Sequence, residues 1–150
     1  MTVGVLTLLI AQAQREIVIA APFLQADQGL SRPPLSDALE AALVRGVHIY
    51  IASTGAALQT IKISSKSEHY RAQIHLYQPQ TNIDDAHRLG SHAKFCIADG
   101  EQAYIGSANL TRPGLGEHLE LGVLVEGALA QQVQSFWKHL LDIGFFVPVN

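Results

Sequence analysis

A histidine and a lysine two residues apart, His92 and Lys94, are the residues of this chain whose types and spacing most clearly allow chemistry. Polarity alternates from residue 92 to residue 98, as in a β-strand, so these two side chains and that of Cys96 are expected on one face. The nearby ammonium disfavours the imidazolium form of His92, and Lys94 offers a phosphate oxygen a positive charge. The pair therefore indicates a neutral, nucleophilic histidine beside a phosphate site.

Two later segments supply groups that would complete such a site. Gly106-Ser107-Ala108-Asn109 ends the next predicted strand and offers a hydroxyl and a carboxamide at a chain bend, which suits an oxyanion. Glu120 lies in a further predicted strand, where its carboxylate could accept the second ring N–H of His92 and fix the tautomer. We expect these groups to converge on one anion.

The first half of the chain is expected to form a helix followed by a βαβ unit. Apolar residues recur at helical spacing between residues 3 and 13, with no basic residue before them, which favours an amphipathic helix over a signal peptide. A buried strand is predicted at 16–24, then a helix with Ser36 as N-cap and Gly46 just past its end, then a strand at 47–52. Short links between these elements predict a sheet covered by helices.

The second half is expected to carry the site on a hairpin and a third strand. Residues 53–71 are interpreted as a helix with a polar loop, residues 74–77 as a short strand and residues 78–91 as a long loop. Asp99-Gly100 predicts a hairpin turn between strands at 92–98 and 102–106, and a further strand is predicted at 119–125. A closing helix would bury one apolar face, formed by Leu129, Val133, Trp137, Leu140 and Leu141.

Composition limits the classes of protein that fit. The chain has 150 residues, of which 48% are apolar and 15% charged, which predicts one globular domain over residues 1–150. The formal net charge of -3 provides no global positive field for a polyanion, so any nucleic-acid contact must be local. The single cysteine excludes an internal disulfide, and no segment approaches the length of a transmembrane helix. We expect a cytoplasmic protein.

The spacing of the candidate residues resembles a known family. His92-Ala93-Lys94-Phe95-Cys96-Ile97-Ala98-Asp99 matches the HxKxxxxD signature of the phospholipase D superfamily at 92–99, and the segment at 106–109 matches the GSxN that follows it. The distance to Glu120 is similar to that in the small nucleases of the family that carry one such motif. The resemblance implies an α/β fold, with a mixed β-sheet sandwiched between helices and one domain per chain.

The resemblance also implies a mechanism and a role for each residue. His92 would attack phosphorus to form a covalent phosphohistidine, without any metal or other cofactor, and Glu120 would assist it. Lys94 and Asn109 would hold the phosphate oxygens with support from Ser107. Asp99 and Gly106 would be supporting residues, since Asp99 at the hairpin turn is better placed to orient its neighbours than to touch substrate.

Only one copy of the motif is present, so the resemblance implies a homodimer. Family members of this kind complete a site with two histidines by pairing two chains about a twofold axis. A second histidine from the partner chain would then protonate the leaving alcohol and later activate water. The most favoured function is a metal-independent endonuclease.

Basic residues in segments of loop character favour nucleic acid, above all DNA, as the substrate. They are Lys62, Lys66, Arg71, Arg88 and Arg112. Two features depart from the family nucleases: His118 stands where asparagine is frequent, and residues 112–117 are rich in glycine and proline. Both features concern substrate contacts and leave the catalytic groups intact.

Other functions stay open on the sequence alone. One alternative is a phospholipid phosphodiesterase or transphosphatidylase; another is a non-catalytic nucleic-acid-binding dimer module in a larger defence assembly, because the chain also resembles the phospholipase D-like component of a bacterial phage-restriction system. A metal site formed by His87, His92 and Asp84 or Asp85 has no recognised ligand spacing. Cys96 is interpreted as a buried apolar residue, and the Phe136-Trp137 pair as core or dimer interface.

Overall fold

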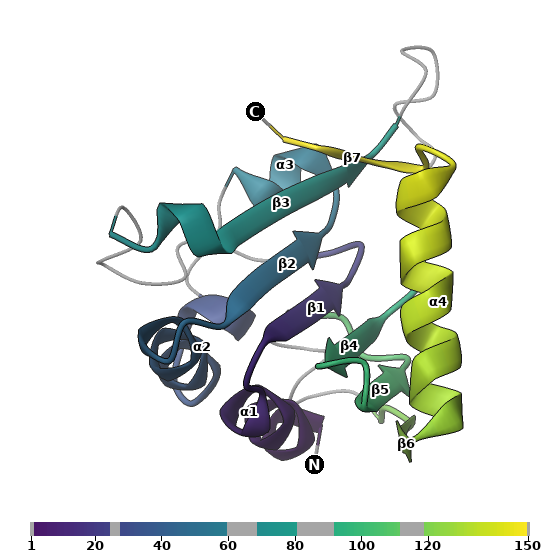
Figure 1. Ribbon diagram of the computed structural model, residues 1–150. Coiled ribbons are helices and arrows are strands. Elements are labelled where there is room, and N and C mark those ends of the chain that lie inside the picture. Colours follow the sequence, from purple (N-terminus) through teal and green to yellow (C-terminus); the bar gives the residue numbers. More distant parts are fainter. Residues whose placement is uncertain (1, 25–27, 60–68, 81–91, 112–118, 150) are drawn as a thin grey trace.

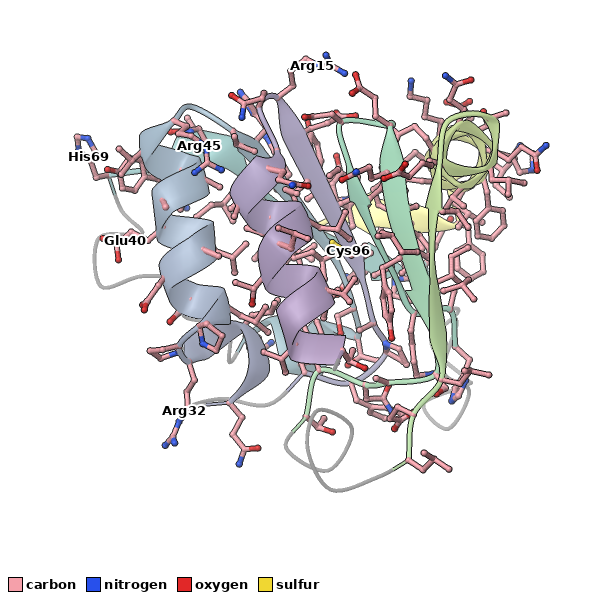
Figure 2. The ribbon with its side chains drawn as sticks, turned by 90° about the horizontal axis from the view of Figure 1, so that it is seen from below. Arg15, Arg32, Glu40, Arg45, His69 and Cys96 are labelled. Carbon is pink, nitrogen blue, oxygen red and sulfur yellow. The ribbon has the colours of Figure 1, made fainter. Side chains whose placement is uncertain are left out.

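A seven-stranded mixed sheet, in the order β6-β5-β4-β1-β2-β3-β7, forms the centre of the computed structural model. The structure describes residues 2–24, 28–59, 69–80, 92–111 and 119–149. Helices α1 and α2 cover one face of the sheet, and α4 crosses the other (Figures 1 and 2). The expected architecture, a mixed sheet between helices, is confirmed.

Most of the elements follow one another in the order that the sequence predicts. The helices and short helical turns are α1 (Thr2–Gln12), η1 (Gly29–Ser31), α2 (Leu35–Val44), α3 (Gly55–Leu58), η2 (Arg71–Gln73) and α4 (Ala128–Asp142). The strands are β1 (Glu16–Ala20), β2 (His48–Ala52), β3 (Ile74–Pro79), β4 (Phe95–Ala98), β5 (Gln102–Gly106), β6 (Gly122–Glu126) and β7 (Phe146–Pro148). Among the described residues, no helix combines the length and apolar character that crossing a bilayer requires.

The predicted βαβ unit is formed by β1, α2 and β2. The two strands are parallel, with Ile17 opposite Ile49 and Ile19 opposite Ile51. Since strand side chains alternate, these four residues pack against α1 and α2, whereas Val18 and its neighbours on the other face pack against α4. Strand β4 runs antiparallel to β1 at the centre of the sheet, so the expected hairpin of β4 and β5 is anchored to the buried core.

Several predicted boundaries differ from the structure in the first half of the chain. Strand β1 ends at Ala20 instead of residue 24. Ser36 lies inside α2 and does not cap it, because its backbone N–H already donates to the Arg32 carbonyl at 3.0 Å and the helix starts before it. Gly46 takes a φ of +88°, as expected for a glycine just past a helix end.

The second half differs in the position of Glu120 and in the closing helix. Strand β6 begins at Gly122, so Glu120 precedes the strand instead of lying within it. Leu129, expected in the buried face of α4, is 57% exposed, and Ala130 is buried in its place, because Ala130 belongs to the core cluster that includes Val18 and Ala103 of the sheet. Strand β7 was not predicted, since its three residues end in a proline and their order depends on pairing with β3.

Candidate active site

His92 and Lys94 lie side by side immediately before β4. The backbone N–H of Gly106 donates to the Lys94 carbonyl at 3.1 Å, so the ladder between β4 and β5 reaches the pair. The ammonium of Lys94 donates to Nδ1 of His92 at 3.1 Å and to the His92 carbonyl at 2.9 Å. Lys94 is only 8% exposed although it is charged. The two residues therefore form the compact pair that their spacing predicts.

The protonation of this pair follows from its surroundings. Burial lowers the pKa of Lys94, and the negative charge of Glu120 raises it in part, with a net value below the ordinary one. Since an ammonium can only donate, Nδ1 of His92 is the acceptor of their hydrogen bond. In the single chain, a neutral His92 ring thus carries its proton on Nε2.

Ser107 and Glu120 are bound to each other. The hydroxyl of Ser107 donates a short hydrogen bond to Oε2 of Glu120 and in turn accepts from the backbone N–H of Leu121 at 3.1 Å. A hydrogen bond between Glu120 and His92 was expected, but within the described residues Glu120 pairs with Ser107. The reason lies in the register of β5 and β6, which pairs Gly106 with Gly122 and so places Glu120 beside Ser107.

Asn109 presents an unused acceptor in the same region. Its Oδ1 is buried and has no hydrogen-bond partner among the described residues. The flanking residues Ala108 and Leu110 are buried, and Leu110 forms an isolated parallel bridge with Leu24, which holds the segment against the end of β1. A buried carboxamide with a free oxygen is a group that a ligand or another side chain can satisfy.

Tyr104 holds the two segments that carry Ser107 and Glu120, a role that sequence reasoning missed. Its ring is buried and lies across the paired glycines Gly106 and Gly122. A Cβ at Gly106 would stand 2.8 Å from the tyrosine hydroxyl, and one at Gly122 would overlap the ring. The glycine of the GSxN motif is therefore required by close packing, and the aromatic residue two positions before it was the available signal.

Asp99, the last residue of the predicted signature, has a structural role at the far end of β4. Its carboxylate accepts hydrogen bonds from the backbone N–H groups of Gln14 and Arg15 at 2.8 Å each and of Glu16 at 2.9 Å. Burial raises its pKa, but these three hydrogen bonds and the Arg15 charge outweigh that effect and leave the pKa below its ordinary value. Asp99 thus fixes the start of β1 and lies away from His92.

Replacing Asp99 is expected to lower stability more than activity. Asp99→Ala removes the three hydrogen bonds and strains a backbone with a φ of +56°, for a loss of about 1–3 kcal/mol in the free energy of unfolding. Asp99→Asn, which tolerates that φ, should lose less. Because the folded-state pKa is lowered, the stability that the Asp99 carboxylate contributes is fully present above the ordinary carboxyl pKa of about 3.9. This stability is lost as the pH falls through the folded-state pKa. Urea unfolding at neutral and acidic pH measures both effects. An Asp99→Ala variant as stable as wild type would contradict this role.

The remaining candidates are either inert or outside the described residues. Cys96 is 1% exposed in the core beneath α1, and burial raises its pKa to about 12, so the expectation of a buried apolar role is confirmed (Figure 2). Arg71 lies in η2, and within the described part of the chain no group of three or more His, Cys, Asp or Glu side chains is placed to hold a metal. The predictions of substrate contacts and metal ligands in other loops concern positions that lie outside the described residues: Lys62, Lys66, Asp84, Asp85, His87, Arg88, Arg112, His118 and the segment 112–117.

An apolar groove of about 500 Å³ opens beside His92 and Lys94. It runs between α4 and strands β4, β5 and β6, and its wall includes Ile105, Leu129 and Phe136, which are 40%, 57% and 47% exposed. Trp137 is buried in the core as expected, whereas its neighbour Phe136 faces this groove. The candidate site therefore combines a buried cation, a histidine and an apolar wall that a single chain leaves open.

Comparison with known proteins identifies the fold. A family model described as "Cardiolipin synthase, PLD-like domain" matches residues 6–141, and no curated protein sequence matches. Nuc from Salmonella typhimurium, a phospholipase D family member, is 22% identical over 98% of this chain and 90% of its own, with a TM-score of 0.67.

Two further solved structures share this fold. The archaeal chromatin protein TrmBL2 is 18% identical over 97% of this chain and 49% of its own, with a TM-score of 0.61. Phosphatidylserine synthase from Haemophilus influenzae is 17% identical over 99% of this chain and 37% of its own, with a TM-score of 0.70. With a family match over most of its length and this shared fold, the chain belongs to the phospholipase D superfamily.

Proposed function

We propose that the protein is a metal-independent phosphodiesterase that cleaves nucleic-acid phosphodiester bonds, with DNA favoured, through a covalent phosphohistidine at a site shared by two chains. The observation that carries this proposal is the buried ammonium of Lys94 in contact with the His92 ring. Nuc, a phospholipase D family member, and a chromatin protein described as binding DNA share the fold. DNA cleavage in excess EDTA, by wild type beside His92→Ala, tests the proposal.

Lys94 links substrate binding to the activation of His92. In the single chain the lysine donates to Nδ1, and the ring proton is on Nε2. When a phosphate oxygen accepts the hydrogen bond of Lys94 in place of Nδ1, Nδ1 is free to receive the ring proton. The proton leaves Nε2, which thereby gains the lone pair that attacks phosphorus. The alkoxide leaves with a proton from His92 of the partner subunit, and water then releases the phosphate from Nε2.

The other residues bind the phosphate or stabilise the arrangement. Asn109 donates to a phosphate oxygen through its amide nitrogen, and its buried Oδ1 accepts from a group that arrives with the substrate or the second chain. Ser107, held by Glu120 and by the backbone of Leu121, supports the same oxygens. Glu120 offsets the positive charge of Lys94, which keeps the ammonium protonated despite its burial.

The second copy of the chain covers the apolar groove beside His92. Three exposed apolar side chains, Ile105, Leu129 and Phe136, lie on this wall. One chain provides one HxK pair, so pairing two chains here brings two such pairs together. We expect Phe136→Glu to produce monomers and to reduce phosphodiester cleavage by roughly 100-fold or more, since each monomer lacks the general acid. Val44→Glu, at a more exposed apolar residue on α2, should remain a wild-type dimer.

Sedimentation analysis and the cleavage assay, applied to both variants, measure this prediction. A dimeric Phe136→Glu, or an active monomer, would overturn the assignment of the groove. Loss of the dimer in Val44→Glu would show that α2, on the opposite face of the sheet, forms the contact instead.

A phospholipid substrate is the second candidate, and one observation favours it. Leu119 and Leu121, on either side of Glu120, are fully exposed and 80% exposed, so two apolar side chains stand at the rim of the candidate site. Phosphatidylserine synthase also shares the fold. Release of headgroup from phospholipid vesicles, with no cleavage of DNA or RNA, would place this function first.

A further inference from the structure

A polar pocket of about 530 Å³ lies at the opposite end of the sheet from His92. It is lined by the first residues of β1 and β2, by the turn after β4 and by α4. Arg15, one of its lining residues, and Arg32 mark opposite ends of the strands in Figure 2. Since Lys94 precedes β4 and Asp99 follows it, the pocket is separate from the candidate active site, and its volume suits a small ligand.

Gln134 contributes an unsatisfied acceptor to this pocket. The side chain is 8% exposed, and its Nε2 donates to Oε1 of Glu16 at 2.8 Å. Its Oε1 is buried and has no hydrogen-bond partner among the described residues. A buried acceptor without a donor is unfavourable, so Gln134 and the Glu16 carboxylate together favour a ligand that presents N–H groups.

Aromatic rings on the sheet are held rigidly beside these acceptors. The Tyr50 ring stacks on that of His75, with centroids 4.5 Å apart and planes 17° apart. Nδ1 of His48 is 3.0 Å from Nε2 of His75, so the orientation of His48 is fixed as well. Tyr50 and His48 both line the pocket, and fixed ring surfaces suit a planar ligand.

One cation of the same pocket, Lys138, offers a contact for an anionic part of the ligand. Lys138 makes no ion pair within the described part of the chain, and Arg15 is paired with Glu101 at 3.1 Å. Glu16 and Asp99 also line the pocket, so Lys138 is the cation available to an anionic group, while these carboxylates would attract a cation such as a guanidinium. A planar ring with N–H donors at one end and an anion at the other matches both sets of groups.

We propose that this pocket binds a nucleotide, free or as part of a strand. An amino-bearing base donates to Gln134 and Glu16 beside the ring of Tyr50, and the phosphate binds Lys138. The binding does not depend on the proposed cleavage reaction, because none of the pocket residues belongs to the candidate active site.

Calorimetric titration of the His92→Ala protein tests the proposal without turnover. AMP and CMP should bind about tenfold or more tightly than ribose 5-phosphate and inorganic phosphate, because only the nucleotides carry a base. Lys138→Ala should weaken AMP binding about tenfold, Lys138→Arg should retain it, and Ser135→Ala, exposed on the same helix, should bind as the parent does. Gln134→Leu should weaken AMP binding severalfold. A phosphorylated trinucleotide distinguishes a strand from a free nucleotide.

Three outcomes would overturn the proposal. Ribose 5-phosphate binding as tightly as AMP would show an anion site only, arginine competing better than AMP would show a site for cations, and unchanged binding by Lys138→Ala would remove the phosphate contact. Cleavage of DNA by the Ser135→Ala chain should equal wild type. A failure of the nuclease proposal appears in that cleavage assay alone and leaves the titration intact.

Discussion

His92→Ala is expected to abolish DNA cleavage in excess EDTA, with a loss of roughly 10⁴-fold or more, because the covalent route has no other nucleophile in this site. Wild type should cleave in the same buffer, since the proposed reaction uses Lys94 and Asn109 for the charge that a metal would otherwise neutralise. The measurement is cleavage of mixed single- and double-stranded DNA by the purified proteins. Acid-labile phosphate trapped on wild type, and absent from His92→Ala, would identify the intermediate.

A matched control is provided by His69→Ala. His69 is exposed and lies near η2, far along the chain from the candidate site, so this variant should cleave DNA at the wild-type rate. Activity retained by His92→Ala would disprove the phosphohistidine mechanism. If wild type cleaves neither DNA nor RNA, the phospholipid candidate or a binding function takes precedence.

Gly122→Ala is expected to destabilise the protein by about 1–3 kcal/mol although the residue is exposed, because its Cβ would overlap the Tyr104 ring. The ring cannot move away easily, since it is buried and its hydroxyl lies 3.3 Å from the Thr2 hydroxyl on α1. The free energy of unfolding in urea measures the loss. Cleavage should also fall, because β6 and β5 position Glu120 and Ser107.

A double-mutant cycle separates this overlap from other causes. Tyr104→Leu removes the ring, so adding Gly122→Ala to it should cost much less than in the wild-type background. Gly4→Ala is the control at a glycine with open space around it, in the first turn of α1, and it should stabilise by up to roughly 0.5 kcal/mol. Equal costs of Gly122→Ala in both backgrounds would disprove the packing role of Tyr104.

The order and type of most elements follow from sequence periodicity. Alternation from residue 92 to 98 and the Asp99-Gly100 turn predict the hairpin of β4 and β5, and the pattern around β1, α2 and β2 predicts a parallel unit. Boundaries are less well determined. Ser36 has the chemistry of an N-cap, yet a hydrogen bond to Arg32 starts α2 earlier, and β7 is ordered by its pairing with β3.

The candidate site likewise has residues that the sequence predicts and contacts that it does not. Residue types and spacing are sufficient to select His92, Lys94 and Asn109, since the motif is local in the chain. The strand predicted at 92–98 begins only at Phe95, so His92 and Lys94 precede it instead of lying within it. The partner of Glu120 is not predictable from the motif, because it depends on the pairing of β5 with β6. That pairing brings Glu120 close enough to Ser107 to accept its hydrogen bond.

The family, the mixed sheet between helices and the chemical identity of the candidate groups are predictable from the amino-acid sequence, because these depend on local patterns of residue type. Tertiary structure alone decided that Asp99 holds the start of β1, that Tyr104 requires glycine at 106 and 122, and that Gln134 leaves an acceptor unsatisfied in a second pocket. Except for Tyr104 and Gly106, which share β5, these contacts join residues that are distant in the chain. Their existence depends on register and packing, which periodicity in one segment does not specify.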